Sequence, residues 1–189
     1  MRLIVVTPPA PFVAIADVRQ HLRLGDDDSQ DALVSAYIAA ACESIDGPLT
    51  WLGRAIGMQT IEARLPAAGS CIRLPGKTVN ELVSIAYLDA AGAEQSADIA
   101  GFDLLGADLF VPGSLWPWAA GISHPEGVRI RYKAGYQPDR VPAPIKVAVM
   151  LMVGDLFQNR ETVAVGVSAS AVPMSTTVET LLGPYRVFA

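Results

Sequence analysis

The sequence predicts an α+β fold in which a helical bundle carries an antiparallel β insertion. Three stretches place apolar residues at helical spacing, two of them before residue 50 and the third near residue 150. Between residues 58 and 136 the pattern changes to short strand-like runs separated by Gly and Pro. The chain has 189 residues, enough to bury a hydrophobic core, and we therefore expect a single domain over residues 1–189.

The first helix is expected over residues 14–24. Within it Ile15, Val18 and Leu22 form one apolar stripe, as in a helix with one buried face. Gly25 follows in the position of a C-cap, where glycine adopts the left-handed backbone conformation most easily. The pattern predicts a short helix that packs along one side.

A longer helix is expected over residues 29–46. Asp28 or Ser29 should cap it, because side-chain oxygens satisfy the free N–H groups of a first helical turn. The sequence Gly47-Pro48 should end it. The main apolar stripe repeats at four, three and four residues and consists of Val34, Ile38, Ala41 and Ile45.

The insertion, residues 58–136, is expected to form an antiparallel sheet of about five strands. In its last run Val128, Ile130 and Tyr132 alternate with charged residues, which predicts a strand with one solvent-exposed face. The sequence DAAGAEQ after the third run is typical of a hairpin turn. The candidate strands are MQTIEARL, CIRLP, ELVSIAYLD, the pair FDLLG and DLFVP, and GVRIRYKAGY.

The third helix is expected over residues 145–159, after prolines that are tolerated before or within a first turn. Its length, about 15 residues at ~1.5 Å each, is roughly 22 Å and too short for a hydrocarbon layer of about 30 Å. We therefore expect a buried helix and no membrane span, although the mean hydropathy of the chain is +0.35. No signal peptide is evident at the N-terminus, which favours a cytosolic, soluble protein. Val149, Met152 and Leu156 form one stripe of this helix, and Val147, Leu151 and Phe157 cover other faces.

The last segment, residues 162–189, is interpreted as a docking tail. Small and apolar residues fill its first part, 162–177, before the closing sequence LLGPYRVF. The alternative is a tail that packs back on the chain's own helices. The residues expected at a partner interface are aliphatic anchors, a tyrosine and an arginine, types common at interfaces: Leu181, Leu182, Tyr185, Arg186 and Val187.

Charge and cysteine content argue against several classes of protein. A net charge of -5 does not suit a general nucleic-acid binder, which normally carries a basic patch. Cys42 and Cys71 are the two cysteines and lack CxxC spacing, so a disulfide framework is not expected. We expect both to be small buried side chains.

No catalytic, cofactor-binding or metal-binding residue is predicted. The sequence RLPGKT resembles a phosphate loop, but Cys71 stands where a Walker motif needs glycine, so we expect a turn between strands. The two histidines, His21 and His124, have no second ligand at metal spacing.

Two other functions are kept as alternatives. One is a small cytosolic enzyme whose Asp103, His124 and Arg129 meet only in the fold, in a deep pocket with shifted pKa values. The other is a binding module that uses Trp116 and Trp118, in the sequence LWPW, as an aromatic platform.

Five phrases, taken together and in this order, resemble the gp6-like head–tail connector proteins of tailed bacteriophages and their phiE125 gp8-like relatives. They are ADVRQHLRL, DALVSAYIAAACESIDGPLTWLGRAI, VRIRYKAGY, VPAPIKVAVMLMVGDLFQNRE and TVETLLGPYRV, and they are spread over nearly the whole chain, from residue 16 to residue 187. The first helix departs from the family in offering only Ala14 as its cap. The Gly47-Pro48 break before Gly53-Arg54 is also unusual.

This resemblance implies a structural protein without enzymatic activity or cofactor. Such connectors form a ring of about twelve copies below the portal protein, extend the DNA channel, and offer a platform to the next connector or tail-completion protein. DNA would pass through without sequence-specific binding. The expected location is the virion neck, with assembly in the host bacterial cytoplasm. The particle would be a phage, a prophage product or a gene transfer agent.

Overall fold

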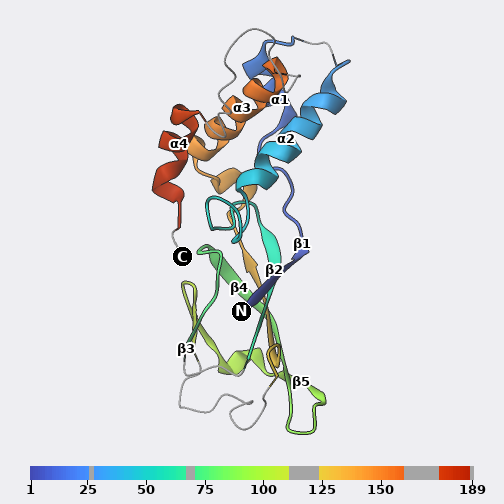
Figure 1. Cartoon of the computed structure of the whole chain (residues 1–189), viewed down its shortest axis with the longest axis vertical. Helices are drawn as coiled ribbons and strands as arrows, with labels where there is room; N and C mark the ends of the chain where they lie inside the picture. Colours follow the sequence, from blue (N-terminus) through green and yellow to red (C-terminus); the bar gives the residue numbers. More distant parts are fainter. Residues whose placement is uncertain (26–27, 67–70, 111–123, 160–174, 188–189) are drawn as a thin grey trace. The chain divides into compact units, whose positions relative to one another are not determined.

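The computed structural model describes residues 1–25, 28–66, 71–110, 124–159 and 175–187 (Figure 1). Helices and antiparallel sheets are both present, so the predicted α+β class is confirmed. The chain divides into two compact units. Unit 1 consists of Met1–Ala10 and Arg54–Gln137, and unit 2 of Pro11–Gly53 and Pro138–Ala189. That the two units act as one connector domain stays a prediction.

Unit 2 holds the helices. Helix α3 contacts each of the other three, so it forms the centre of the bundle. All four residues of the predicted α2 stripe are buried: Val34, Ile38, Ala41 and Ile45. The helices are α1 (Ile15–Leu22), α2 (Asp31–Ile45), α3 (Ala143–Gln158) and α4 (Thr176–Leu182), with short 3-10 turns at Pro138–Arg140 and Gly183–Tyr185.

The predicted caps of α1 and α2 are wrong. Helix α1 ends two residues before the expected position, and Arg23, with φ 59°, takes the left-handed C-cap conformation in place of Gly25. Helix α2 begins at Asp31 after the N-cap Gln30, whose side chain makes no capping hydrogen bond. The physical reason is a backbone turn, in which the Asp31 N–H donates to the Asp28 carbonyl (3.0 Å) before the helix starts.

Helix α3 is buried along one face. Pro142 is its N-cap residue and Pro144 lies in its first turn, as predicted. Val147 and Leu156 are 39% and 38% exposed, so the expected stripe through Leu156 is wrong at its C-terminal end. Among the described residues, no helix is both long enough and apolar enough to cross a membrane. The buried residues of α3 are Ile145, Ala148, Val149, Val153 and Gly154.

Unit 1 holds two antiparallel sheets. The larger has the order β1-β2-β8-β4-β5, and the smaller has the order β3-β7-β6. The expectation of about five strands for residues 58–136 is too low, since the described part of that range forms seven, and an eighth strand, β1, lies outside it. The strands are β1 (Arg2–Thr7), β2 (Gln59–Leu65), β3 (Cys71–Arg73), β4 (Val79–Leu88), β5 (Glu94–Ala97), β6 (Asp103–Leu105), β7 (Asp108–Phe110) and β8 (Val128–Ala134), with a 3-10 turn at Ile99–Gly101.

The alternation predicted for β8 is confirmed. Val128, Ile130 and Tyr132 are fully buried, and the Tyr132 hydroxyl donates to the Pro75 carbonyl (3.0 Å). The hairpin turn after β4 is also confirmed, because the Asp89 carboxylate accepts the N–H groups of two residues in it. Residues of both sheets share one hydrophobic core: Ile61, Leu65, Ile72, Leu74, Ile85, Leu109, Val128, Ile130 and Tyr132.

The other face of the large sheet carries paired charges. Glu62 of β2 is buried, with a side chain 3% exposed, and accepts hydrogen bonds from Arg64 (2.6 Å) and Arg131 (2.5 Å). Burial by itself would raise the pKa of Glu62, but the hydrogen bonds from Arg131 and Arg64 outweigh it and lower the pKa below the ordinary 4.5. The remaining ion pairs of this face are Arg2–Glu126, Arg64–Glu126, Arg129–Glu94 and Lys133–Glu81.

We expect Glu62→Gln to lower the free energy of unfolding by about 1–3 kcal/mol at pH 7, because two charge-assisted hydrogen bonds lose their anion. Since the folded pKa of Glu62 is below the unfolded value, its stabilisation is complete above pH 4.5 and is lost as pH falls further. Urea unfolding at pH 7 and pH 3 checks this, and the difference between the proteins should shrink at pH 3. Glu81→Gln is the control, since the Glu81–Lys133 pair is exposed and worth about 1 kcal/mol or less. Equal losses for both variants would contradict the prediction.

Candidate docking surface

The described part of the tail packs on the chain's own helices. Helix α4 contacts α3, and its Val178 and Leu182 are almost completely buried. The Ser175 hydroxyl oxygen caps α4 by accepting the Val178 N–H (3.3 Å). Of the two possibilities considered for the tail, internal packing therefore describes these residues in the isolated chain.

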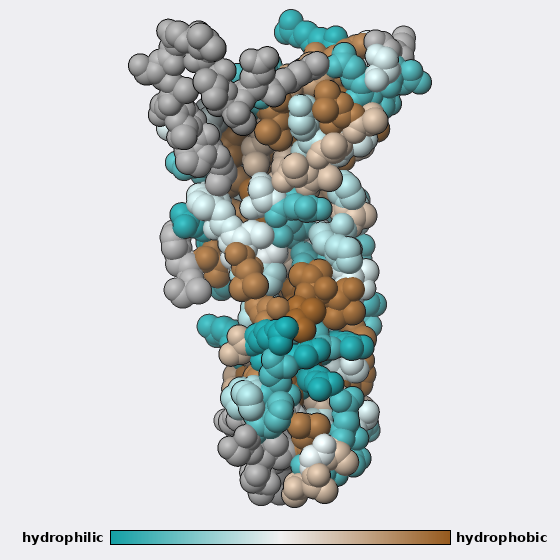
Figure 2. All heavy atoms as spheres, turned by 45° about the vertical axis from the view of Figure 1, so that its right-hand side comes forward, coloured by the Kyte–Doolittle hydropathy of each residue, from teal (hydrophilic) through white to brown (hydrophobic). Residues whose placement is uncertain are grey.

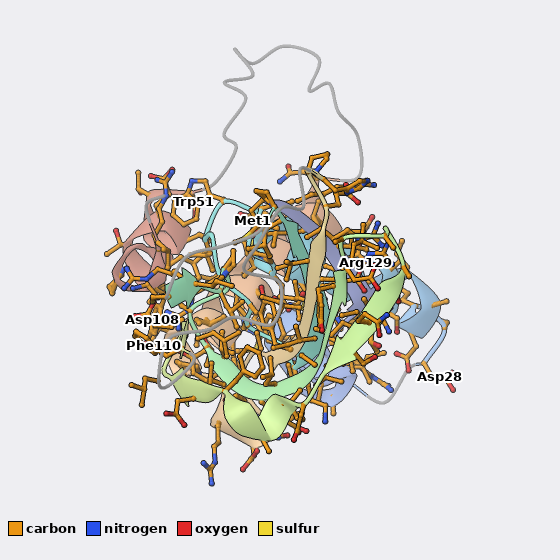
Figure 3. The ribbon with its side chains drawn as sticks, turned by 90° about the horizontal axis from the view of Figure 1, so that it is seen from below. Met1, Asp28, Trp51, Asp108, Phe110 and Arg129 are labelled. Atoms are coloured by element: carbon orange, nitrogen blue, oxygen red, sulfur yellow. The ribbon has the colours of Figure 1, made fainter. Side chains whose placement is uncertain are left out.

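Two contacts fix the end of the tail against the loop that follows α2. The Val187 N–H donates to the Leu52 carbonyl (2.8 Å), and Leu52 itself is fully buried. The Arg186 guanidinium lies over the Trp51 ring, 4.4 Å from its centroid, as in a cation–π contact. Figure 3 shows Trp51 beside the red C-terminal helix. We call these two contacts the tail contact.

Gly53 allows this close approach. Its φ is +64°, and a Cβ placed there would lie 2.7 Å from the Val187 carbonyl oxygen. Any residue with a side chain would therefore have to displace the end of the tail or strain the loop.

We expect Gly53→Ala to release the tail contact, so that residues 183–187 exchange their amide protons faster. Gly25→Ala is a matched control, because Gly25 has the same φ of +64° and none of the described residues lies within 4 Å of the position that its Cβ would take. Both variants carry the left-handed strain of about 1–2 kcal/mol, but only Gly53→Ala carries the clash. Hydrogen exchange with mass spectrometry reads the difference at the tail peptide, and equal exchange in the two variants would refute this role of Gly53.

The five residues predicted at the partner interface differ in accessibility. Arg186 is exposed, Leu181, Tyr185 and Val187 are half-buried, and Leu182 has no exposed surface. Leu182 thus serves the helical bundle in this structure. A contact of these residues with a portal protein stays a prediction.

The loop before Gly53 adds an exposed residue that the sequence pattern did not single out. Leu49 is 79% exposed, the highest value among the large hydrophobic residues that the structure describes. The loop is held in shape by the Thr50 hydroxyl, 2.8 Å from the Ile45 carbonyl and 2.9 Å from that of Gly47. We define the docking surface as Leu49, Trp51 and Arg186. A leucine at a turn is the signal that could have found it, because turns favour polar residues and glycine.

The residues of the alternative enzyme are not brought together by any interaction described in this structure. Asp103 lies on β6 of the small sheet, whereas Arg129 lies on β8 of the large sheet, paired with Glu94 at 2.8 Å. His124 is exposed, and its Nδ1 accepts the Glu126 N–H (3.1 Å). Trp116 and Trp118, the alternative aromatic platform, lie outside the described residues.

The described residues offer no metal site, and one of the two cysteines is exposed. Within the described ranges, no three His, Cys, Asp or Glu residues are grouped so that they could hold a metal ion. Cys42 is buried as expected, but Cys71 is exposed, so that expectation is wrong for Cys71. Cys71 begins the edge strand β3, and its side chain points away from the core that holds Ile72.

Comparison with known proteins gives the arrangement its context. Residues 13–96 match the family model of phage gp6-like head–tail connector proteins. The resemblance to this family is confirmed. This connector match spans α1, α2 and the first strands of the insertion. No curated protein matches the chain by sequence.

Solved structures match the chain over its whole length. A chain in the neck of an empty gene transfer agent (GTA) particle, computed with C6 symmetry, has a TM-score of 0.76 and 25% identity, covering 100% of this chain and 97% of that one. A chain in the virion of a native GTA particle has a TM-score of 0.74 at 25% identity and the same coverage. A chain in a native GTA neck computed with C12 symmetry has a TM-score of 0.70 at 23% identity, which shows the fold.

Proposed function

We propose that the chain is a non-enzymatic head–tail connector that forms a ring below the portal protein in the neck of a phage, prophage or gene transfer agent particle. The observation that carries this proposal is the match, over 100% of this chain and 97% of the other, to a chain in a particle neck. The match to the connector family over residues 13–96 supports the same role from sequence. About twelve copies are proposed, in keeping with the C12 symmetry used for one similar neck.

DNA passage is proposed to occur without retention of the DNA. The chain has a net charge of -5, and the cations on the outer face of the large sheet are paired with glutamates at 2.5–3.0 Å. A cation that is already paired with a glutamate neutralises DNA phosphates less than an unpaired cation does. Fewer counterions are then released from the DNA, so paired cations add little affinity for it. A chain with this charge balance would let DNA slide through a channel that it lines.

The docking surface is proposed to contact the portal protein or the next connector. Trp and Arg are enriched at interface hot spots, and an exposed leucine beside them supplies an apolar anchor. The half-buried Leu181 and Tyr185 of the predicted tail interface would extend this contact. Opening of the tail contact would also make Leu182 and Val187 available, at the cost of the packing that they make in the free chain.

The experiment that tests the proposal is the native mass of the purified chain, measured by light scattering after gel filtration over a range of concentrations. A discrete particle of about twelve chains is expected, alone or after mixing with the portal protein of the same particle. A chain that stays a monomer in both conditions would refute the ring. In the mixing experiment, Leu49→Asp should reduce portal binding, whereas Ala36→Asp, on an exposed position of α2, should not.

A further inference from the structure

The outer face of the large sheet changes character between β8 and β5. Long charged side chains cover β2 and β8, whereas β4 and β5 carry Glu81 and Glu94 near their starts and short side chains at the positions between. The strand register places Ser84 opposite Arg131, and Ala86 between Arg129 and Ser96. Alanine is less common in strands than β-branched and aromatic residues, so a contribution to sheet stability does not explain why Ala86 stands on the inner strand β4. These small side chains leave room above the sheet.

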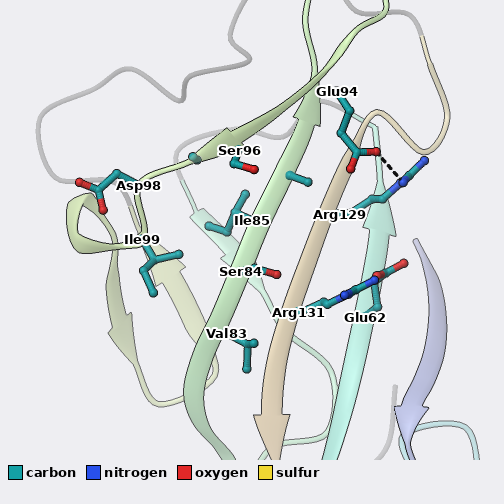
Figure 4. A pocket seen from close by; sticks show the side chains of 12 residues that line it. Glu62, Val83, Ser84, Ile85, Glu94, Ser96, Asp98, Ile99, Arg129 and Arg131 are labelled. Carbon is teal, nitrogen blue, oxygen red and sulfur yellow. Dashed lines mark hydrogen bonds and ion pairs between the residues drawn. The ribbon is translucent and has the colours of Figure 1, made fainter.

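That room is a groove of about 450 Å³ (Figure 4). Ser84 and Ala86 line its floor, and Val83 and Ile99, 38% and 40% exposed, contribute apolar surface to its rim. Figure 4 shows Glu94 of β5 reaching across to Arg129, where an ion pair of 2.8 Å bridges the two strands. Most of the other lining residues are polar or charged: Glu62, Glu94, Ser96, Asp98, Arg129 and Arg131. The apolar surface of Val83, Ala86 and Ile99 between them offers space for one aliphatic side chain delivered by another chain.

The same unit carries such a side chain on a supported hairpin. Leu105, at the turn between β6 and β7, is 67% exposed. Below the turn Leu109 is fully buried, the Ala107 carbonyl accepts the Leu74 N–H (2.7 Å), and Asp108 makes two hydrogen bonds to Arg73 (2.7 and 3.0 Å). The turn is thus held by the core and by an ion pair, while its leucine stands in solvent. Hydrophobic side chains reach the surface among hydrophilic ones elsewhere too (Figure 2), but few are as exposed as Leu105.

The leucine and the groove lie on opposite sides of unit 1. Seen from below, Asp108 and Phe110 of the hairpin are on the left and Arg129 is on the right (Figure 3). Figure 1 agrees, since β3, the partner of β7, lies on the left of the sheets and β5 on the right. A ring needs this kind of contact, in which two different surfaces of one chain meet on neighbouring copies.

We propose that the β4–β5 groove receives Leu105 of a second copy of this chain, and that this contact repeats from copy to copy around the ring. The inference rests on the proposed ring and names the surfaces that build it. Both surfaces belong to unit 1, so the contact depends only on the structure within that unit. The ion pair between Glu94 and Arg129 would form one end of the groove that holds Leu105.

Cysteine cross-linking tests the contact in the full chain. Leu105→Cys and Ser96→Cys are made separately in a Cys71→Ser background. Cys42 can stay, because burial raises the pKa of its thiol to about 11 and keeps it protonated. On mixing and mild oxidation we expect disulfide-linked dimers of the two variants, and a ladder of multimers from one chain that carries both cysteines. Val5→Cys, on the exposed strand β1, replaces Ser96→Cys as the control and should cross-link at least ten-fold less.

A second measurement uses no cross-link. Leu105→Asn should reduce the ring to smaller species while its circular dichroism stays unchanged, and Ala36→Asn, at an exposed position of α2 outside both proposed contacts, should keep the ring. Dimers from Leu105→Cys alone, or equal cross-linking to Val5→Cys, would overturn the head-to-tail contact. A ring-sized native mass without Leu105–Ser96 cross-links would overturn this inference and leave the proposed function standing. A chain with neither a ring nor cross-links would overturn both.

Discussion

Replacing Gly135 by alanine is expected to lower the free energy of unfolding by about 3–5 kcal/mol. Gly135 directly follows β8 and has φ +116°, a conformation that residues with a side chain rarely adopt. A Cβ there would overlap the Gly57 carbonyl group and lie 2.9 Å from the Met58 nitrogen. The cost therefore combines backbone strain with a clash against backbone atoms, which cannot rotate away as a side chain can.

The surroundings of Gly135 leave little freedom to relieve that clash. Its N–H donates to the Thr78 carbonyl (2.8 Å), and its carbonyl accepts the Asn80 side-chain amide (2.6 Å). The next residue, Tyr136, donates its N–H to the Ile56 carbonyl (2.6 Å). Moving the strand end away from Gly57 would break these hydrogen bonds together.

Urea unfolding followed by circular dichroism measures the effect. Gly92→Ala is the control, because Gly92 also has a positive φ, +79°, but nothing lies within 4 Å of a Cβ placed there. It should cost about 1–2 kcal/mol from strain alone. If both variants unfold at the same urea concentration, the strand end does not pack on Gly57 in solution.

The helices and the central strand were predictable because their patterns are strong and local. The spacing of Val34, Ile38 and Ile45 reports a buried helical face, and the alternation of β8 reports a sheet with one wet side. Helix caps were less predictable, since a backbone turn took the place of an Asp or Ser cap before α2. The apolar patterns depend on residues close in the sequence and were predicted, whereas the cap depends on the backbone conformation of the preceding turn and was not.

The two edge strands of the large sheet, β1 and β5, were missed because they become strands of this sheet only through pairing in the fold. β1, RLIVVT, has strand-favouring residues but lies far from the insertion and joins the sheet by pairing with β2, and β5 is the polar sequence EQSA, which pairs with β4 across the Asp89 turn. The docking surface was missed in part for a similar reason. Trp51 and Arg186 lie far apart in the sequence, and only the fold stacks one on the other.

Leu181 and Leu182 are adjacent in the tail, and only the structure shows that they differ in burial. Sequence treats Leu181 and Leu182 alike as anchors for a partner. The structure places Leu182 in the bundle without exposed surface, whereas Leu181 is half-buried. Successive residues of a helix point about 100° apart, so the register of α4 decides which leucine faces α3.

Leu182→Ala is therefore expected to destabilise the chain by about 2–5 kcal/mol, because it removes a fully buried side chain and leaves a cavity between α4 and α3. Leu181→Ala, one residue away on the same helix, should cost about 1 kcal/mol or less, since part of its surface already faces solvent. Thermal unfolding of the two variants measures the difference. Binding to the portal protein separates the roles further: Leu181→Ala should weaken binding at unchanged stability if the tail is an interface. If Leu182→Ala unfolds at the wild-type temperature, α4 does not pack on α3 in the free chain, and the tail is open to a partner before assembly begins.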